Sequence, residues 1–547
     1  MGEMNKSYKD LLNTLQSGFL DPLLVKSRRD LLEIAMEDAL DRLEGMQYGS
    51  PIWWGKGEEI DYERAWRQEM PEDSSSLKEV IPYIVQFLKG IPIYGHPETV
   101  SNVIPQSTIP SIIGATLAAI CNPNIMEEAY GGKACEAEIE VVSMISSLIG
   151  YDKKKSCGFF TFGGTGTNMY GIKIGAQKVT KDGRERGLRK DVKVLASDVS
   201  HYSILNVMDW LGIGTDNLIK IRSEEDNSIS ISDLEKELRK LLDKNEVIAC
   251  IVPTLGTTDS FGVDNIKDVA KLRDDLVDEY SLDYIPHIHA DSVIGWVFSV
   301  FNDYDFDKNS LGLPWSDDIK KINDKIKYLY LADSAGIDFH KLGYAPYISS
   351  LFILKDRKDL DLISRDESLM PYLYHTGHYH PGRYTLETSR GGGGVLSALS
   401  NLHFLGKNGY SVLLAHSVEM TMLFREKVKE IGAVILNDKN IGPSTLFRIY
   451  PEEYKDNRLD AYKKEIEDNA SLLKECNEYN ERIFRRVDER VRSKGEGIIF
   501  SMTKRYKQTE YGADITALKA YMTSPHIKNE NIESIVREIS NAITQIT

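Results

Sequence analysis

The chain has 547 residues, which is enough for two or three domains with a sizeable buried core. Hydrophobic residues make up 41% of the sequence and charged residues 27%, a composition typical of folded proteins that excludes a largely disordered chain. The formal net charge is −16, and this excess of acidic side chains disfavours a nucleic-acid partner, because such binding requires clustered positive charge.

Two further features bear on the cellular location. The first residues, MGEMNKSYKD, contain no apolar segment behind a basic one, and no stretch of about 18 apolar residues predicts a membrane helix. The five cysteines are scattered without CxxC spacing, so they indicate neither a disulfide scaffold nor a metal site. We therefore expect a cytoplasmic protein with reduced thiols, no membrane insertion and no bound metal.

The N-terminal part of the chain is predicted to be helical. Residues 27–46 and 76–90 both place apolar side chains at three-to-four spacing, which is the period of one helix face. We interpret residues 1–100 as a helical segment that packs against the rest of the protein or forms a dimer.

The middle of the chain, residues 101–405, alternates between short apolar segments and helical ones. Helices are expected at 168–179, 233–244 and 265–280, with Ser232 as the cap of the second. This alternation predicts a mostly parallel sheet covered by helices on both faces, with ligands at the carboxyl ends of the strands. The expected strands are 158–162, 192–197, 246–256, 284–291, 327–334 and 349–356.

The last region, residues 406–547, has the mixed pattern of a small α+β domain. An apolar strand is expected at 444–450, and a long charged amphipathic segment follows at 463–493. We interpret that segment as a surface helix. The sequence thus predicts an N-terminal helical segment, a large domain and a small C-terminal domain.

Lys341 is the first candidate for chemistry. It is the only lysine between Lys327 and Lys355, and it follows a histidine and an apolar segment. Lysine is seldom buried unless it is paired or chemically used, although a lysine that extends its head to the surface is the alternative. A lysine that forms an imine must lose its proton near neutral pH, which burial among apolar neighbours favours.

Asp291 is the second candidate, within IHADSVIGW at residues 288–296. It could cap a helix or shape a turn. Its functional interpretation is a buried carboxylate that faces a pyridine nitrogen and keeps that nitrogen protonated. The ring then accepts the electrons that remain on the substrate when carbon dioxide departs.

Three further elements follow predicted strands. The glycine-rich segment FGGTGTNMYGIK at 162–173 could bind a phosphate through backbone N–H groups at a helix start, or be a tight structural turn. It fits neither of the nucleotide motifs GxGxxG and GxxxxGK[ST]. His201 could lie over a cofactor ring or be an ordinary loop histidine, and Thr257 and Thr258 could be site residues or turn hydroxyls.

The order of these elements along the chain favours the functional interpretations. They follow one another as phosphate loop, ring histidine, threonine pair, carboxylate and lysine, and this set resembles the group II pyridoxal-phosphate decarboxylases, which include the glutamate, aromatic amino-acid and tyrosine decarboxylases. GGTGTNMY is similar to their phosphate loop, HADS to their HxDA motif and DFHK to their xPHK motif. GYAPY and YTLETSRGGGG are most similar to microbial tyrosine decarboxylases.

The resemblance implies fold type I, the aspartate aminotransferase-like architecture of pyridoxal-phosphate-dependent transferases, with pyridoxal 5′-phosphate as the cofactor. It implies that Lys341 forms a Schiff base with the cofactor, Asp291 pairs with the pyridine nitrogen and His201 stacks on the ring. It also implies a loop tyrosine that protonates the substrate carbon, for which we favour Tyr372 over Tyr374. The other implied positions are cofactor contacts at Thr165, Gly166, Thr167, Thr258 and His340, and a substrate contact at Tyr347.

Departures from the family pattern leave the substrate open. Ser292 and Val293 replace alanines, and Phe339 replaces the proline of xPHK. Lys519 stands where many members have an arginine for the substrate carboxylate. GYAPYISS is also similar to the GYAPKGSS of sphingosine phosphate lyase, which cleaves a carbon–carbon bond by retro-aldol chemistry.

We therefore predict a lyase of amino-acid metabolism that decarboxylates a small-molecule substrate, an aromatic and tyrosine-like L-amino acid. The alternatives are another carbon–carbon lyase on the same scaffold, an aldehyde-forming decarboxylase, and a non-catalytic descendant. The family shares its active site between subunits, which implies a homodimer. Pocket shape and loops decide the substrate in such folds, and the sequence alone does not reveal them.

Overall fold

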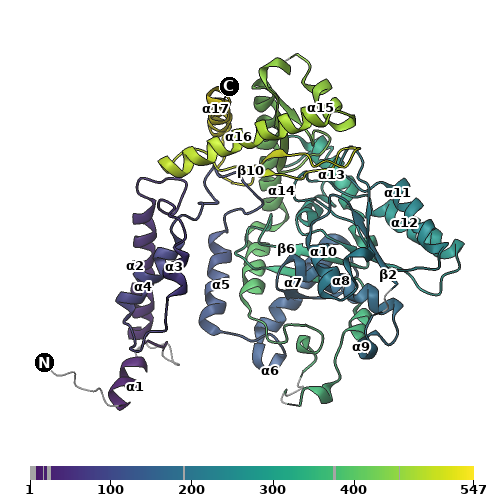
Figure 1. Cartoon of the computed structure of the whole chain (residues 1–547). Coiled ribbons are helices and arrows are strands. Elements are labelled where there is room, and N and C mark those ends of the chain that lie inside the picture. Colours follow the sequence, from purple (N-terminus) through teal and green to yellow (C-terminus); the bar gives the residue numbers. More distant parts are fainter. Residues whose placement is uncertain are drawn as a thin grey trace.

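The computed structural model describes residues 8–16, 18–20, 26–188, 191–371, 373, 377–454 and 456–546 (Figure 1). The two candidate loop tyrosines, Tyr372 and Tyr374, lie outside these described residues. Within them, no helix combines the length and the apolar character that a membrane span needs. The described chain forms a large helix-covered sheet, a small C-terminal sheet and a column of N-terminal helices (Figure 1).

The large sheet contains seven strands in the order β1-β7-β6-β5-β4-β2-β3, and β7 alone among them runs antiparallel to its neighbours. Strand β4, with the sequence VIACIV, is almost entirely buried, as expected for a strand covered on both faces. The predicted mostly parallel sheet is confirmed. Its strands are β1 Cys157–Thr161, β2 Val192–Ser197, β3 Leu218–Ile221, β4 Val247–Val252, β5 His287–Ala290, β6 Ser334–Asp338 and β7 Ser350–Leu354.

The helices of the N-terminal and large regions include the predicted ones, with α2 and α4 in the N-terminal column (Figure 1). Helix α8 packs closely on β4 and β5 because two glycines face the sheet. A Cβ at Gly171 would lie 2.3 Å from the His289 ring. The helices are α1 Tyr8–Gln16, α2 Lys26–Gln47, α3 Tyr62–Trp66, α4 Leu77–Val85, α5 Ile109–Cys121, α6 Glu128–Gly131, α7 Lys133–Ile149, α8 Gly164–Val179, α9 Gly183–Arg186, α10 Ser203–Trp210, α11 Ile231–Leu242, α12 Ile266–Glu279 and α13 Ser316–Ile326.

The strand predicted at 327–334 is wrong. That segment contains the short helical turn Leu329–Leu331, and β6 begins only at Ser334. Strand β6 has the sequence SAGID, whose small residues do not give a strong hydrophobic pattern. The small residues are required because α8 lies close: a Cβ at Gly336 would be 2.3 Å from Thr167 Oγ1.

The predicted cap of α11 is also wrong. The helix begins at Ile231, earlier than predicted, and its N-cap is Ser230 rather than Ser232. Ser230 Oγ accepts the backbone N–H of Asp233 at 3.4 Å, which satisfies one of the free donors at the helix start. Both serines stand within one turn of the helix start, so the sequence pattern alone did not separate them.

The predicted surface helix at 463–493 is two helices, α15 Arg458–Glu467 and α16 Ala470–Lys494. The chain breaks between them because Asn469 caps the second helix, accepting the Leu472 N–H at 3.0 Å. One face of α16 is buried against the C-terminal domain, so only its other face is at the surface.

The small C-terminal sheet is antiparallel and has the strand order β10-β11-β9-β8. Its presence confirms the predicted small α+β domain, and β9 matches the strand predicted at 444–450. The predicted border after residue 405 falls inside the long helix α14, at a kink where Gly406 has φ 56° and ψ −175°. The elements of this region are α14 Gly393–Glu430, β8 Ala433–Ile435, β9 Ser444–Ile449, β10 Ser501–Thr503, β11 Ala517–Tyr521 and α17 Asn529–Ile546.

Candidate active site

A cavity of about 210 Å³ lies at the carboxyl ends of β2, β4, β5 and β6, next to the start of α8. This is the edge of a parallel sheet where ligands bind in α/β folds. Several chain segments that are far apart in sequence meet there. The predicted site residues in its lining are Thr165, His201, Thr258, Asp291, His340, Lys341 and Tyr347.

Asp291 follows β5 and is only 2% exposed. Its Oδ2 accepts a hydrogen bond from Asn168 Nδ2 at 3.0 Å. Its Oδ1 is buried and has no hydrogen-bond partner among the residues that the structure describes. A buried carboxylate oxygen without a partner is costly, so this atom marks the place where a cationic donor of a bound ligand fits.

Lys341 follows β6 and lies beside a carboxylate. Its Nζ is 3.1 Å from Asp338 Oδ2, and its side chain is 20% exposed. Ser350 Oγ donates to the other Asp338 oxygen at 2.6 Å, which fixes the carboxylate. The expected surroundings of apolar side chains are therefore only part of the environment, because a buried carboxylate lies beside the amine.

The glycine-rich segment forms the start of α8. Gly163, with φ 117°, makes the turn that leads from β1 into the helix, and Thr165 faces the cavity. The first N–H groups of a helix have no acceptor within it and carry the positive end of its dipole, which favours a phosphate. Two predicted phosphate contacts point elsewhere: Thr167 Oγ1 donates to the Gly164 carbonyl at 2.8 Å, and Gly166 packs against β1.

His201 and His340 line the cavity from different strands. Burial is the main cause that lowers the pKa of both imidazoles, which favours their neutral forms. The His340 ring lies against Tyr347, with ring centroids 4.1 Å apart. Tyr347 is 56% exposed, so it stands at the mouth of the cavity.

Several residues of the lining were not predicted from the sequence. Asn168 lies one helical turn after the glycines, within GGTGTNMY. Asp338 lies three residues before Lys341, within DFHK. Their roles depend on contacts with other segments, which the sequence does not show. The remaining unpredicted lining residues are Gly164, Ser203, Thr254, Gly256 and Val293.

Lys519, on β11, is not free to bind a substrate carboxylate in this structure. Its Nζ donates to Asp259 Oδ1 at 2.7 Å, and the side chain is 7% exposed. The neighbouring Tyr521 hydroxyl donates to the carbonyl of Thr258. These two bonds tie the small domain to the loop after β4.

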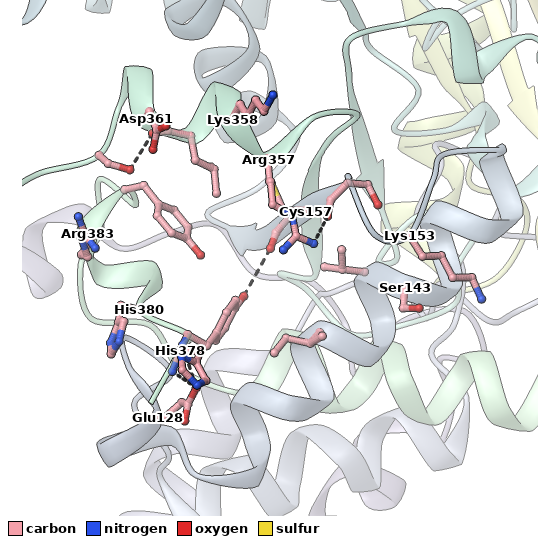
Figure 2. Close-up of a pocket in the computed structure, with 18 residues that line it drawn as sticks. Glu128, Ser143, Lys153, Cys157, Arg357, Lys358, Asp361, His378, His380 and Arg383 are labelled. Atoms are coloured by element: carbon pink, nitrogen blue, oxygen red, sulfur yellow. Dashed lines mark hydrogen bonds between the residues drawn. The ribbon is translucent and has the colours of Figure 1, made fainter. Parts of the chain in front are cut away.

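A larger cavity, of about 670 Å³, lies beside β1 and α7 (Figure 2). None of the predicted site residues is among the described residues that line it. One carboxylate of its lining has partners within the chain: Glu128 accepts the backbone N–H groups of His378 and Tyr379, each at 2.8 Å. The Tyr379 hydroxyl donates to the buried Glu138 at 2.7 Å. We interpret this cavity as the place where the segment from residue 377 onward is fixed to the sheet.

The smaller cavity fits pyridoxal phosphate. Asp291 offers an unpaired buried oxygen for a protonated ring nitrogen, and Lys341 offers an amine for an aldehyde. The start of α8 offers N–H groups for a phosphate, and a Cβ at Gly164 would come within 2.9 Å of Asp338 Oδ2. The donor set thus matches the three functional groups of the cofactor, on separate walls of one cavity.

Comparisons with known proteins point to the same chemistry. Residues 61–299 match the family model of the pyridoxal-dependent decarboxylase conserved domain. An L-2,4-diaminobutyrate decarboxylase from Acinetobacter baumannii is 23% identical over 399 residues, which are 70% of this chain and 73% of that protein. An L-tyrosine decarboxylase from Enterococcus faecium is 26% identical over 400 residues, which are 65% of this chain and 63% of that protein.

The fold is also similar to solved structures. The crystal structure of Oryza sativa TDC with PLP and tryptamine has a TM-score of 0.75 and 14% sequence identity, and covers 96% of this chain and 100% of the other. This likeness confirms the predicted fold type I architecture. The match at residues 61–299 and the decarboxylase relatives support the predicted family and cofactor. The chain therefore carries the pyridoxal-dependent decarboxylase domain and is a pyridoxal-phosphate-dependent carboxy-lyase.

Proposed function

We propose that this protein decarboxylates an aromatic, tyrosine-like L-amino acid to the corresponding amine and carbon dioxide. The observation that carries the proposal is Asp291, a buried carboxylate with a free Oδ1 in the same cavity as Lys341. The relatives named above act on tyrosine and on 2,4-diaminobutyrate. They therefore support amino-acid decarboxylation in general more strongly than they support any particular substrate side chain. The GYAPY segment, with Tyr347 at the cavity mouth, supports an aromatic substrate.

The residues that line the cavity have different proposed roles, according to where they lie. When bound, pyridoxal phosphate supplies a ring that withdraws electrons from the substrate carbon as carbon dioxide leaves. Asp291 would pair with the protonated ring nitrogen, and His201 would lie against the ring; both side chains line the cavity. Lys341 would hold the cofactor through Nζ, and Asp338 Oδ2 lies 3.1 Å from that nitrogen.

Other predicted residues hold the two ends of the bound molecules. Thr165 and the first N–H groups of α8 would bind the phosphate, with His340 nearby, and Thr258 would lie beside the ring; all three side chains line the cavity. Tyr347 contacts the substrate. A loop tyrosine, for which we favour Tyr372, or a histidine returns a proton to the substrate carbon after carbon dioxide has left.

We also infer a homodimer in the cytoplasm. Apolar side chains of the N-terminal column and of α5 are exposed over a wide surface, which in a folded protein indicates a partner surface. All five cysteines are free, which agrees with a reducing compartment. The exposed residues include Ile34, Leu40, Ile60, Trp66, Ile109, Ile112 and Ile113. Light scattering of the purified chain tests the dimer, and a monomer at assay concentration contradicts it.

The function is tested with the purified chain and added pyridoxal phosphate. We expect an absorbance band from the bound cofactor, a borohydride-reduced adduct on Lys341, and carbon dioxide release from tyrosine above other amino acids in a panel. Carbon dioxide release from diaminobutyrate or aspartate alone would contradict the aromatic substrate. An aldehyde product without an amine, or cleavage of a phosphorylated aminoalcohol, would replace the proposal with an alternative reaction.

A further inference from the structure

A row of buried side chains extends from Asp291 into the protein interior. Asn168 Nδ2 donates to Asp291 Oδ2 at 3.0 Å, and Asn168 Oδ1 lies 3.1 Å from His289 Nε2. The Ser334 hydroxyl lies 2.8 Å from His289 Nδ1 and 2.8 Å from His287 Nε2. All five side chains are at most 2% exposed. Because a buried polar group is costly without a partner, such an arrangement is stable only when its hydrogen bonds are made together.

The carboxylate at one end fixes the direction of these bonds. A carboxylate only accepts, so Asn168 presents its amide NH₂ group to Asp291, and the second amide proton faces Ser203 Oγ at 3.1 Å. Asn168 Oδ1 is then the acceptor toward the sheet. It accepts from His289, which places the proton of that ring on Nε2.

The same reasoning continues through the serine. Burial lowers the pKa of His289 to about 3, so the ring is neutral and its bare Nδ1 accepts from the Ser334 hydroxyl. The Ser334 oxygen accepts in turn from His287 Nε2, and burial lowers the pKa of that ring as well. His287 Nδ1 has no hydrogen-bond partner within the described chain. One N–H or O–H of each of these four residues therefore points toward Asp291, while the second amide proton of Asn168 faces Ser203.

The fold holds this row in place from both sides. His289 lies opposite Ser334 in the parallel register of β5 and β6, and His287 is two residues earlier on the same face. Helix α8 covers both rings with glycines: a Cβ at Gly171 would be 2.3 Å from the His289 ring, and one at Gly175 would be 3.0 Å from His287 Cβ. Larger residues at these helix positions would displace the imidazoles.

We propose that Asn168, His289, Ser334 and His287 form a directional relay that positions Asp291 with Oδ1 free and stabilises its negative charge. This inference rests on the proposed role of Asp291 toward the ring nitrogen. Aligned hydrogen bonds polarise one another, and bonds to a charged acceptor are the strongest, so the relay favours a protonated ring nitrogen. His289, Ser334 and His287 do not line the cavity, and they are positioning residues that act through Asn168.

The relay is tested by removing its middle member in the full chain. In Ser334→Ala, we expect His289 to lose the pure Nε2–H tautomer in ¹⁵N-edited spectra of histidine-labelled protein without cofactor. With ¹⁵N-labelled pyridoxal phosphate bound, we expect the ring-nitrogen signal to move toward the unprotonated position. The dissociation constant of the cofactor should rise about tenfold, which is the scale of one hydrogen bond to a charged network.

Two variants separate this role from a merely structural one. Ser334→Thr keeps the hydroxyl and should restore both signals, even if its extra methyl group lowers stability. Ser299→Ala removes a buried hydroxyl that has no hydrogen-bond partner in the described chain, and it should change neither signal.

The outcomes distinguish the relay from the function on which it rests. If Asp291→Asn shifts the ring-nitrogen signal and Ser334→Ala does not, the relay is refuted while the proposed role of Asp291 stands. If Asp291→Asn leaves that signal unchanged, the proposed role falls and the relay with it. A His289 ring that carries its proton on Nδ1 in the unsubstituted chain refutes the direction of the relay, whether or not cofactor binds.

Discussion

The cavity at the glycine-rich turn and the cavity beside the start of β1 differ in size and in the hydrogen bonds of their carboxylates. The smaller one, about 210 Å³, contains a buried carboxylate oxygen without a partner. The larger one, about 670 Å³, contains a carboxylate that already accepts two backbone N–H groups, from His378 and Tyr379 (Figure 2). Volume alone would identify the larger cavity as the active site. The buried carboxylate oxygen without a hydrogen-bond partner identifies the smaller one instead.

The difference follows from what each cavity does in the fold. At the smaller cavity, strand ends bring polar side chains together around a space for a ligand. Behind the larger cavity, the buried pair of Arg390 and Glu138, 2.6 Å apart, joins β1 to the segment after residue 377, and Glu138 also accepts from the lining residue Tyr379. Substitutions at the smaller cavity should therefore change cofactor binding or the decarboxylation rate. Substitutions at the larger cavity should change only the free energy of unfolding, or have no effect.

The largest effect is expected for Lys341→Ala. Without Nζ the cofactor cannot be held covalently, so we expect the borohydride adduct to disappear and decarboxylation to fall on the order of a thousandfold or more. The folded structure should persist, because Lys341 is 20% exposed and its partner Asp338 keeps the bond from Ser350. Mass spectrometry of the reduced protein and the rate of carbon dioxide release are the measurements. If the variant still formed the adduct, a lysine other than Lys341 would have to bind the cofactor.

Asp291→Asn should have the next largest effect. An amide cannot stabilise a positive ring nitrogen as a carboxylate does, so we expect the decarboxylation rate to fall about a hundred- to a thousandfold. Asp264→Asn is a matched control, because Asp264 is also a fully buried carboxylate but does not line the cavity. It accepts the backbone N–H groups of Ile229 and Thr254. The control should lower the unfolding temperature without changing the cofactor spectrum, and equal loss of activity in both variants would argue against a specific role for Asp291.

The sequence predicted the elements of this comparison unevenly. The buried strands β2 and β4 have apolar β-branched residues that the hydrophobic pattern detects, whereas β6 is composed of small residues because α8 packs on it. Lys341 and Asp291 could be predicted because each stands in a motif after an apolar segment. Asn168 and Asp338 were missed, because their importance lies in atoms contributed by other segments.

The larger cavity could not have been predicted at all. It joins residues of α7 and β1 with residues from 357 to 384, and no local pattern in the sequence relates these segments. Glu138 looks like an ordinary charged residue of an amphipathic helix, yet it is fully buried against Arg390. Only the tertiary structure shows that this pair is internal.

Arg390→Met tests the structural role of the buried pair behind the larger cavity, where Glu138 accepts the hydroxyl of the lining residue Tyr379. The guanidinium pairs with Glu138 and donates to the carbonyls of Phe160 and Ile125, each at 2.9 Å. Its loss leaves the buried Glu138 carboxylate without its cation and removes a donor from two carbonyls, so we expect the free energy of unfolding to fall by about 3 kcal/mol. Chemical denaturation measures this. Adding Glu138→Gln should recover part of the loss, and no recovery would show that the charge pair is not its source.

Arg357→Ala should have the smallest effect and is the sharpest test of the comparison. Arg357 is exposed at the larger cavity, and its guanidinium donates to the Ser156 carbonyl at 3.2 Å (Figure 2). Because an exposed side chain with one such bond contributes little, the free energy of unfolding should change by less than about 0.5 kcal/mol, and cofactor affinity and decarboxylation rate by no more than about twofold. Lys153→Ala, another exposed cation of this cavity, is the control for general charge. If Arg357→Ala alone slowed decarboxylation with unchanged stability, the larger cavity would take part in the reaction, and the separation between a chemical and a structural cavity would fail.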